Sequence, residues 1–74
     1  MSKLPLLKPK ELIRILGKLG FQLIRQKGSH MFFRHPDGRT ATVPFHKGED
    51  IGRGLLNKIL DDIEICKEEF IKYL

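Results

Sequence analysis

The chain has 74 residues, of which 41% are hydrophobic and 31% are charged, a composition typical of a globular protein. Its length is near the smallest at which a single hydrophobic core suffices, so a second chain is a candidate to complete the fold. Residues 1–60 hold 12 basic and 4 acidic side chains (+8), whereas residues 61–74 hold 2 and 5 (−3). A positive body predicts a polyanionic partner, most simply nucleic acid, although a merely soluble basic protein has the same balance.

Several classes of protein are excluded by composition. Cys66 is the only cysteine, so the chain can form neither an internal disulfide nor a cysteine-based zinc site. The three histidines lack the short paired spacing of structural zinc, and we expect no metal and no small-molecule cofactor. No apolar run approaches the roughly 18 residues of a membrane span, and residues 1–5 lack the h-region expected of a signal peptide. We therefore expect one soluble, cytoplasmic domain, residues 1–74, with no membrane partner.

Residues 9–19 are predicted to form a helix. Pro9 suits its first position, and Gly20 suits the position after its end. Apolar residues follow one stripe at helical spacing, and basic residues repeat on another side. Arg14 and Lys18 are candidates for phosphate contact, as on the first helix of double-stranded-RNA-binding domains, or they lie on a solvated helical face. The apolar stripe comprises Leu12, Ile13, Leu16 and Leu19.

Two strands are predicted around a turn at Gly28, over residues 21–26 and 31–35. Side chains alternate between the faces of a strand, so Met31 and Phe33 share one face while His30, Phe32 and Arg34 share the other. If the first face meets the helix, His30 and Arg34 project together from the open face. The opposite assignment stays open, because Phe32 is as apolar as Phe33.

A third strand is predicted over residues 40–45, after the hairpin signal Pro36-Asp37-Gly38. Pro44 cannot donate a ladder hydrogen bond, so this strand should lie at an edge or end there. Helical spacing returns over residues 55–63, and residues 70–74 indicate a short last helix. The predicted fold class is α+β, a small single domain with the order helix, three meandering strands, helix and short helix.

The stretch Lys27-Gly28-Ser29-His30 is the candidate functional site. Glycine takes a positive φ at no steric cost, so Gly28 can reverse the chain and leave His30 at the rim of the sheet. Histidine has the side chain whose unperturbed pKa is nearest neutrality, so a rim histidine among cations is a candidate acid or base. The alternative, an ordinary surface or core histidine, stays open.

Five short motifs, of which the Gly28 turn is one, are spread along the chain. Gly-Phe at 20–21, Gly-Ser-His at 28–30, Pro-Asp-Gly at 36–38, Val-Pro-Phe-His at 43–46 and Gly-Leu-Leu-Asn-Lys-Ile-Leu at 54–60 occur in this order. Together they resemble the HicA toxins of bacterial toxin–antitoxin pairs, also called the YcfA-like family. The resemblance covers the chain from about Lys8 to Leu74, and the order and spacing of the motifs are fairly specific.

The resemblance implies a double-stranded-RNA-binding-like α-β-β-β-α fold and a ribosome-independent endoribonuclease acting on mRNA. It implies that the histidine of Gly-Ser-His, here His30, is the essential residue and that a HicB-like antitoxin covers it. The chain departs from the family at Leu55, where threonine is common, and at Asp62-Ile63-Glu64, where glycine is common. These departures concern the helical end, which bears on antitoxin pairing, and leave His30 untouched.

RNA carries its own nucleophile, the ribose 2′-OH, so cleavage needs no serine or metal. A proton acceptor, a proton donor and cations around the phosphorane suffice. Our hypothesis is that His30 is the general base or acid. The predicted RNA-binding residues are Lys27, Gly28, Ser29, Arg34 and Lys47.

Three polar side chains near this site have alternative roles. Ser29 is expected to contact the phosphate or orient the imidazole, or else to bond its own backbone as a turn residue. His46 is a second candidate proton carrier if the third strand ends near Gly28, and otherwise serves the turn. His35 is interpreted as solvated hairpin surface.

Two other classes of function fit the same sequence. One is a non-catalytic RNA-binding module that uses the same basic face. The other is an interaction protein whose positive face docks an acidic partner. A neighbouring gene for a HicB-like protein would favour the nuclease.

Overall fold

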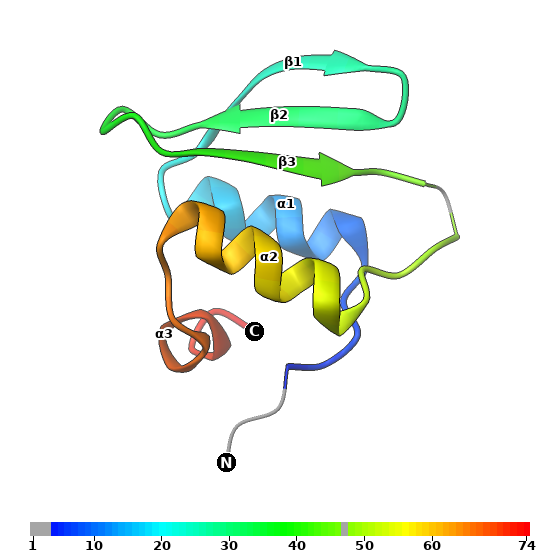
Figure 1. Cartoon of the computed structure of the whole chain (residues 1–74), viewed down its shortest axis with the longest axis vertical. Coiled ribbons are helices and arrows are strands. Elements are labelled where there is room, and N and C mark those ends of the chain that lie inside the picture. Colours follow the sequence, from blue (N-terminus) through cyan, green and yellow to red (C-terminus); the bar gives the residue numbers. More distant parts are fainter. Residues whose placement is uncertain (1–3, 47) are drawn as a thin grey trace.

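The computed structural model describes residues 4–46 and 48–74. The predicted α+β class and element order are confirmed (Figure 1). The bounds differ by at most two residues from those expected, except that the last helix begins and ends three residues earlier. The sheet is antiparallel with the strand order β1-β2-β3, so it is a meander of two hairpins. Within these residues, no helix has the length and apolar character needed to cross a membrane. The elements are α1 (Pro9–Lys18), β1 (Gln22–Lys27), β2 (His30–Arg34), β3 (Thr40–Pro44), α2 (Arg53–Ile63) and α3 (Lys67–Ile71).

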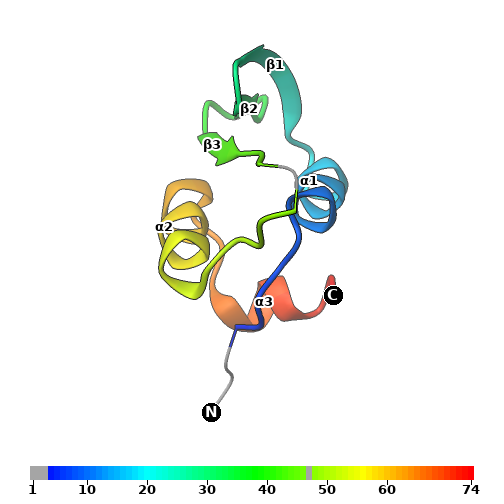
Figure 2. The same ribbon diagram turned by 90° about the vertical axis from the view of Figure 1, so that its right-hand side faces the viewer.

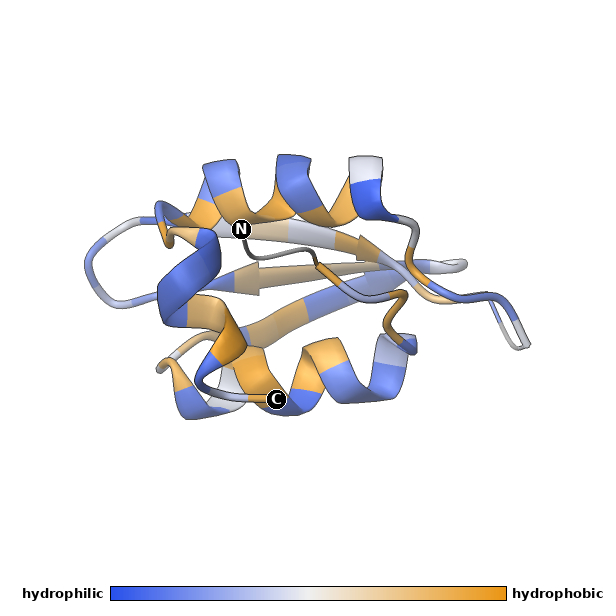
Figure 3. Cartoon of the chain, turned by 90° about the horizontal axis from the view of Figure 1, so that it is seen from below, coloured by the Kyte–Doolittle hydropathy of each residue, from blue (hydrophilic) through white to orange (hydrophobic). Residues whose placement is uncertain are grey.

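The hydrophobic core lies between the two long helices and the β3 side of the sheet. Phe33 on β2 is 3% exposed and Val43 on β3 is fully buried. The hydrophobic sides of α1 and α2 face inward and their hydrophilic sides face solvent (Figure 3). Phe70 of α3 is also fully buried, so the short last helix closes one end of this core. Burying these side chains is the main stabilising contribution to the fold.

Strand β1 lies at the edge of the sheet farthest from the helices (Figures 1 and 2). All six of its residues are exposed, among them the apolar Leu23 and Ile24. Its pairing with β2 is interrupted by a bulge between Leu23 and Arg25. The sheet therefore extends beyond its helical layer, and β1 is held mainly by its ladder to β2.

The segment before α1 belongs to the core, which the sequence analysis did not predict. Leu4 and Leu7 are 3% and 6% exposed. Leu7 and Ile51 exchange two backbone hydrogen bonds of 3.3 and 2.6 Å. Arg53 donates from Nε to the Leu4 carbonyl oxygen at 2.6 Å. These contacts hold the chain entering α2 against the chain entering α1.

Arg14 connects α1 to the C-terminal end of the chain. Its guanidinium pairs with Glu11 one turn away and donates from Nη2 to the Tyr73 carbonyl oxygen at 3.2 Å. The hydrogen bond from Arg14 lowers the pKa of the Glu11 carboxyl. Arg14 is therefore held on the surface of α1 by these two contacts, and its contact with phosphate stays a prediction.

The hairpin between β2 and β3 is attached to α2 by Arg39. Nη1 of Arg39 donates to the Ile63 carbonyl oxygen at 2.5 Å, and the guanidinium lies 5.2 Å from the centre of the Phe21 ring. The Asp37 carboxylate accepts from the backbone amide of Arg39 at 3.0 Å and from its Nε at 2.8 Å. These contacts, the backbone hydrogen bond first, lower the pKa of Asp37.

His35 is a packed residue, in contrast to the solvated surface position expected. Its side chain is only 22% exposed, and its ring meets that of Phe21 edge to face at 5.1 Å. Its Nδ1 accepts a hydrogen bond from the Asp37 backbone amide at 3.1 Å. A Cβ at Gly20 would lie 2.9 Å from the His35 Nε2, so glycine is required there for close approach as well as for its φ of +98°.

Helix α2 ends at Glu64, which adopts a left-handed conformation with φ +58° and ψ +42°. Glu64 lies in the segment where the resemblance makes glycine common. An L-residue with a Cβ pays about 1–2 kcal/mol in this region, and glycine does not. The chain therefore retains backbone strain at the junction of α2 and α3.

We expect Glu64→Gly to stabilise the protein. The relief of strain exceeds the extra entropy of glycine in the unfolded chain, about 0.5–1 kcal/mol, and leaves a gain of up to ~1 kcal/mol. For a domain of this size that gain raises the thermal midpoint by roughly 4–8 °C. The matched control Lys58→Gly, inside α2, should lower stability by ~1 kcal/mol. A midpoint for Glu64→Gly at or below that of the wild type would contradict the strain.

We expect Asp37→Asn to lower the thermal midpoint at pH 7. The folded-state pKa of Asp37 is below its unfolded value, so the stabilisation is fully present above the ordinary pKa of aspartate, about 3.9. It is lost as the pH falls through the lowered folded value, and the two midpoints should converge in acid. Thermal unfolding followed by circular dichroism from pH 7 to acid measures this. A constant difference at every pH would exclude the carboxylate as its source.

Candidate functional site

Gly28 and Ser29 form the tight turn between β1 and β2. Gly28 has a φ of +58° and Ser29 has no positive φ, the pattern of a type II′ hairpin turn. The Gln26 side-chain amide donates to the Gly28 carbonyl oxygen at 3.2 Å, and the Phe45 backbone amide donates to the Ser29 carbonyl oxygen at 2.6 Å. The predicted reversal at Gly28 is confirmed, and His30 begins β2 directly after it.

The faces of β2 are assigned by burial. Phe33 is buried and Met31 packs against the core, so His30, Phe32 and Arg34 lie on the open face of the sheet. Of the two assignments that the sequence left open, this is the one in which His30 and Arg34 project away from the helices. We call this surface, formed by the side chains of the sheet opposite the helices, the open face.

His30 is an exposed side chain with a cation beside it. In the ladder it lies directly opposite Lys27 on β1 and opposite Pro44 on β3. Directly opposite residues of antiparallel strands project from the same face with their Cβ atoms about 4.5–5.5 Å apart. An imidazole and an ammonium group can therefore reach the same bound group at this end of the sheet.

The open face is positively charged. The three strands contain Arg25, Lys27 and Arg34 and no Asp or Glu. Arg25 pairs with Phe32 in the ladder, and its guanidinium carbon lies 4.8 Å from the centre of the Phe32 ring. Neighbouring cations without carboxylates on the same strands attract anions, and the effect is weakened by salt.

Arg34 lies at the opposite end of β2 from His30. The two are four positions apart, which is about 14 Å at the rise of an antiparallel strand. Arg34 lines a pocket of about 230 Å³ together with Gln22, Ile24 and two hairpin residues. The structure therefore brings Lys27 next to His30 and places Arg34 at the far end of the strand.

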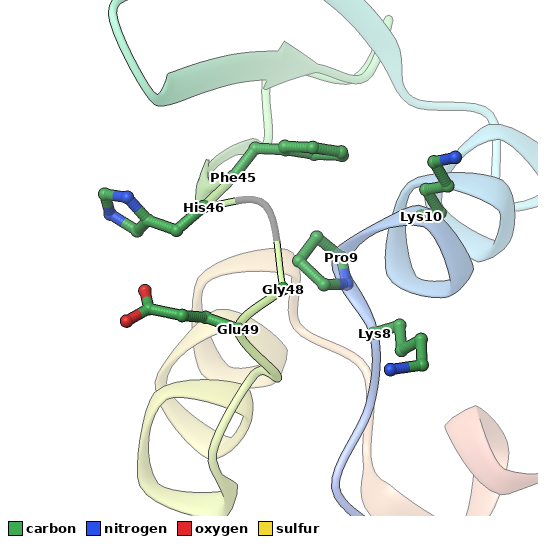
Figure 4. Close-up of a pocket in the computed structure, with 7 residues that line it drawn as sticks. All are labelled: Lys8, Pro9, Lys10, Phe45, His46, Gly48 and Glu49. Atoms are coloured by element: carbon green, nitrogen blue, oxygen red, sulfur yellow. The ribbon is translucent and has the colours of Figure 1, made fainter.

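A larger cavity, of about 410 Å³, lies at the end of β3. The ring of Phe45 extends toward Pro9 and Lys10, whereas His46 and Glu49 point to the other side (Figure 4). The hydrogen bond from the Phe45 amide to Ser29 places this cavity next to the Gly28-Ser29 turn. Its lining residues are Lys8, Pro9, Lys10, Phe45, His46, Gly48 and Glu49.

The condition set for His46 is met, because β3 ends beside the turn that precedes His30. The His46 side chain is exposed and is directed away from the ring of Phe45 (Figure 4). Its role as a second proton carrier stays a prediction. Lys47 falls outside the described residues. Ser29 contributes its backbone carbonyl to the turn through Phe45.

Over residues 4–46 and 48–74 there is no group of three or more His, Cys, Asp or Glu side chains placed to hold a metal ion. The arrangement offers instead an exposed imidazole for proton transfer and cations for an anionic ligand. Sequence reasoning did not assign Arg25, Phe32 or Phe45 to the site. For Phe32 the sequence did contain a signal, because strand alternation places it on the same face as His30. Arg25 could not be found in this way, because the bulge in β1 breaks the alternation.

These features define a small α+β domain whose positively charged sheet face presents one histidine at a hairpin. A family model described as the HicA toxin of bacterial toxin–antitoxin matches residues 9–65. The chain therefore belongs to the HicA toxin family and is the toxin of a toxin–antitoxin system, which includes an antitoxin partner. None of the curated proteins compared with the chain matches it.

Proposed function

We propose that this toxin is an endoribonuclease that cleaves mRNA without a metal, and that His30 moves a proton in the reaction. The observation that supports this most directly is the exposed imidazole of His30, opposite Lys27, on a sheet face without carboxylates. Because the chain belongs to the HicA toxin family, we expect this site to carry the toxic activity.

The proposed chemistry uses the RNA itself as the nucleophile. The 2′-OH loses its proton and its oxygen bonds to the adjacent phosphorus, while the bond from phosphorus to the 5′-oxygen breaks and that oxygen gains a proton. The products are a 2′,3′-cyclic phosphate and a 5′-hydroxyl. His30 carries one of these two protons, as base or as acid, and His46 is the candidate carrier of the other.

The cations stabilise the charge that develops on the phosphorane. Lys27 is the nearest assigned cation to His30, because the two residues are paired across the hairpin. Gly28 has no side chain at the turn, which allows the phosphate backbone to come close. Ser29 adds a hydroxyl beside it. Arg34 binds a phosphate farther along the RNA, and Lys47, outside the described residues, is a further candidate for phosphate contact.

The antitoxin is proposed to be a HicB-like protein that covers the open face. A surface with Arg25, Lys27 and Arg34 and no acidic neighbour on its strands favours an acidic protein partner for the same reason that it favours RNA. Such a partner excludes the substrate by occupying its site, and needs to reach His30 to do so.

The second candidate function is a non-catalytic RNA-binding module that blocks its target by occupancy. The pairing of Arg25 with the ring of Phe32 favours it, because both groups are suited to binding RNA and neither moves a proton. The nuclease and the binding module differ in the consequence of removing His30.

We expect His30→Ala to abolish cleavage and growth arrest. Loss of a proton carrier costs typically 10²–10⁴ in rate, whereas the phosphate contacts of Lys27 and Arg34 remain and keep RNA affinity within a few fold. Cleavage of a labelled transcript, growth on induction and the thermal midpoint are measured together. Cleavage by the wild type should persist in EDTA.

The companion variant is His46→Ala, which removes the exposed histidine proposed as the second proton carrier. A partial loss in this variant supports His46 as the second proton carrier. A folded His30→Ala protein that cleaves at the wild-type rate would show that His30 is not the catalyst. Complete loss of wild-type activity in EDTA, restored by a divalent ion, would contradict the metal-free mechanism.

We expect RNA affinity to fall steeply with salt. For single strands the logarithm of affinity falls by ~0.7 per logarithm of salt for each phosphate contact, because each contact releases counterions. Lys27→Gln and Arg34→Gln should each reduce the magnitude of that slope by ~0.7, the contribution of one phosphate contact. The control Lys72→Gln, beyond the end of α3 and away from the sheet, should leave it unchanged. A flat salt response in the wild type would rule out the open face as a phosphate-binding surface.

A further inference from the structure

Phe32 is an aromatic side chain on the face of the sheet that the helices leave open. It is half-buried, and its ladder neighbours on that face are Arg25 on β1 and Thr42 on β3. The Arg25 guanidinium lies over its ring at 4.8 Å. The other phenylalanines of the strands and their ends face the core or the cavity beside β3, so the position of Phe32 is not explained by packing in the core.

Aromatic rings on an open sheet face are the usual platform on which proteins stack unpaired RNA bases. Stacking tolerates any base, because every base has a π-face, and it operates together with cations that hold the backbone. Phe32 has this environment, with Arg25 and Lys27 on the neighbouring strand and the small Thr42 on the other.

The position of Phe32 along β2 relates it to the proposed chemistry. It lies two residues from His30 and two from Arg34 on the same face, about 7 Å from each at the rise of a strand. An imidazole, an aromatic ring and a guanidinium therefore follow one another in a line. A strand of RNA with a phosphate at His30 can place an adjacent base on Phe32 and a later phosphate at Arg34.

We propose that Phe32 is the stacking platform for an unpaired base next to the phosphate at His30, so that the substrate is single-stranded RNA. The Arg25 guanidinium covers the ring when RNA is absent. The base takes that place, and the guanidinium then pairs with a neighbouring phosphate. Bases in a duplex stay stacked on one another, so double-stranded RNA cannot use this platform. This inference rests on the proposed function, because it takes RNA to be the ligand.

The chain contains no tryptophan, which allows a direct test. Phe32→Trp in a His30→Ala background places one indole on the platform without cleavage of the ligand. A short unstructured RNA oligonucleotide should quench its fluorescence with the same saturation curve that anisotropy gives for binding. The control Tyr73→Trp places the indole after α3, where it packs against the helical side of the core and not on the open face, and should not be quenched.

Affinity gives the second measurement. In the His30→Ala background, Phe32→Ala should weaken binding of the oligonucleotide by about 5- to 150-fold, the range for loss of one stacked base. Phe32→Tyr retains the ring and should bind within a few fold of the parent. Phe32→Leu retains apolar bulk without a π-face, should also lose affinity, and replaces Phe32→Ala if that variant does not fold. A duplex of the same sequence should bind equally to all of them.

Three results would overturn the inference while leaving the proposed function in place. They are parental affinity in folded Phe32→Ala or Phe32→Leu, quenching of Tyr73→Trp with none in Phe32→Trp, and a Phe32-dependent affinity for the duplex. The proposed function is tested separately by cleavage with His30 intact. A wild-type toxin that neither binds nor cleaves RNA would overturn both.

Discussion

The orientation of the site depends on which side chains of β2 and β3 are buried. Phe33 and Val43 occupy the core, and the period of a strand is two residues, so their burial fixes His30 on the opposite face. A slip of one residue between β2 and β3 that turned β2 over would bring Phe33 to solvent and His30 inward, at the cost of the core. Hydrophobic packing at one end of β2 therefore keeps a polar group accessible at the other.

One side of the sheet stabilises the fold, and the other side carries the charged groups of the candidate site. The helical side contains the apolar clusters and the long-range attachments of Arg39 and Leu7, whereas the open face concentrates cations that repel one another. That repulsion opposes folding and is relieved when an anion binds, so ligands of this face also stabilise the fold. Strand β1, which contains two of these cations, lies beyond the helical layer (Figure 2).

The sequence was sufficient for features that are set locally. Proline and glycine mark the start of α1 and the turns at Gly28 and Gly38, and short-range periodicity gives the element order. It left the faces of β2 undecided, because Phe32 and Phe33 are equally apolar and only tertiary packing separates them. The packing of His35 and the burial of Leu4 depend on partners far along the chain, which no local pattern encodes.

The bulge at Ile24 is another feature that local alternation does not predict, and it is the reason that Arg25 was not assigned to the open face. The bulge also affects whether two toxin molecules can pair along their sheet edges. Regular alternation would place Arg25 on the side of Leu23, but the inserted residue turns it to the face of Phe32. The same insertion interrupts the row of backbone donors and acceptors along the outer edge of the sheet. With Arg25 and Lys27 beside that edge, two copies are disfavoured from joining strand to strand, which protects a small protein with an exposed Ile24 from edge-to-edge aggregation.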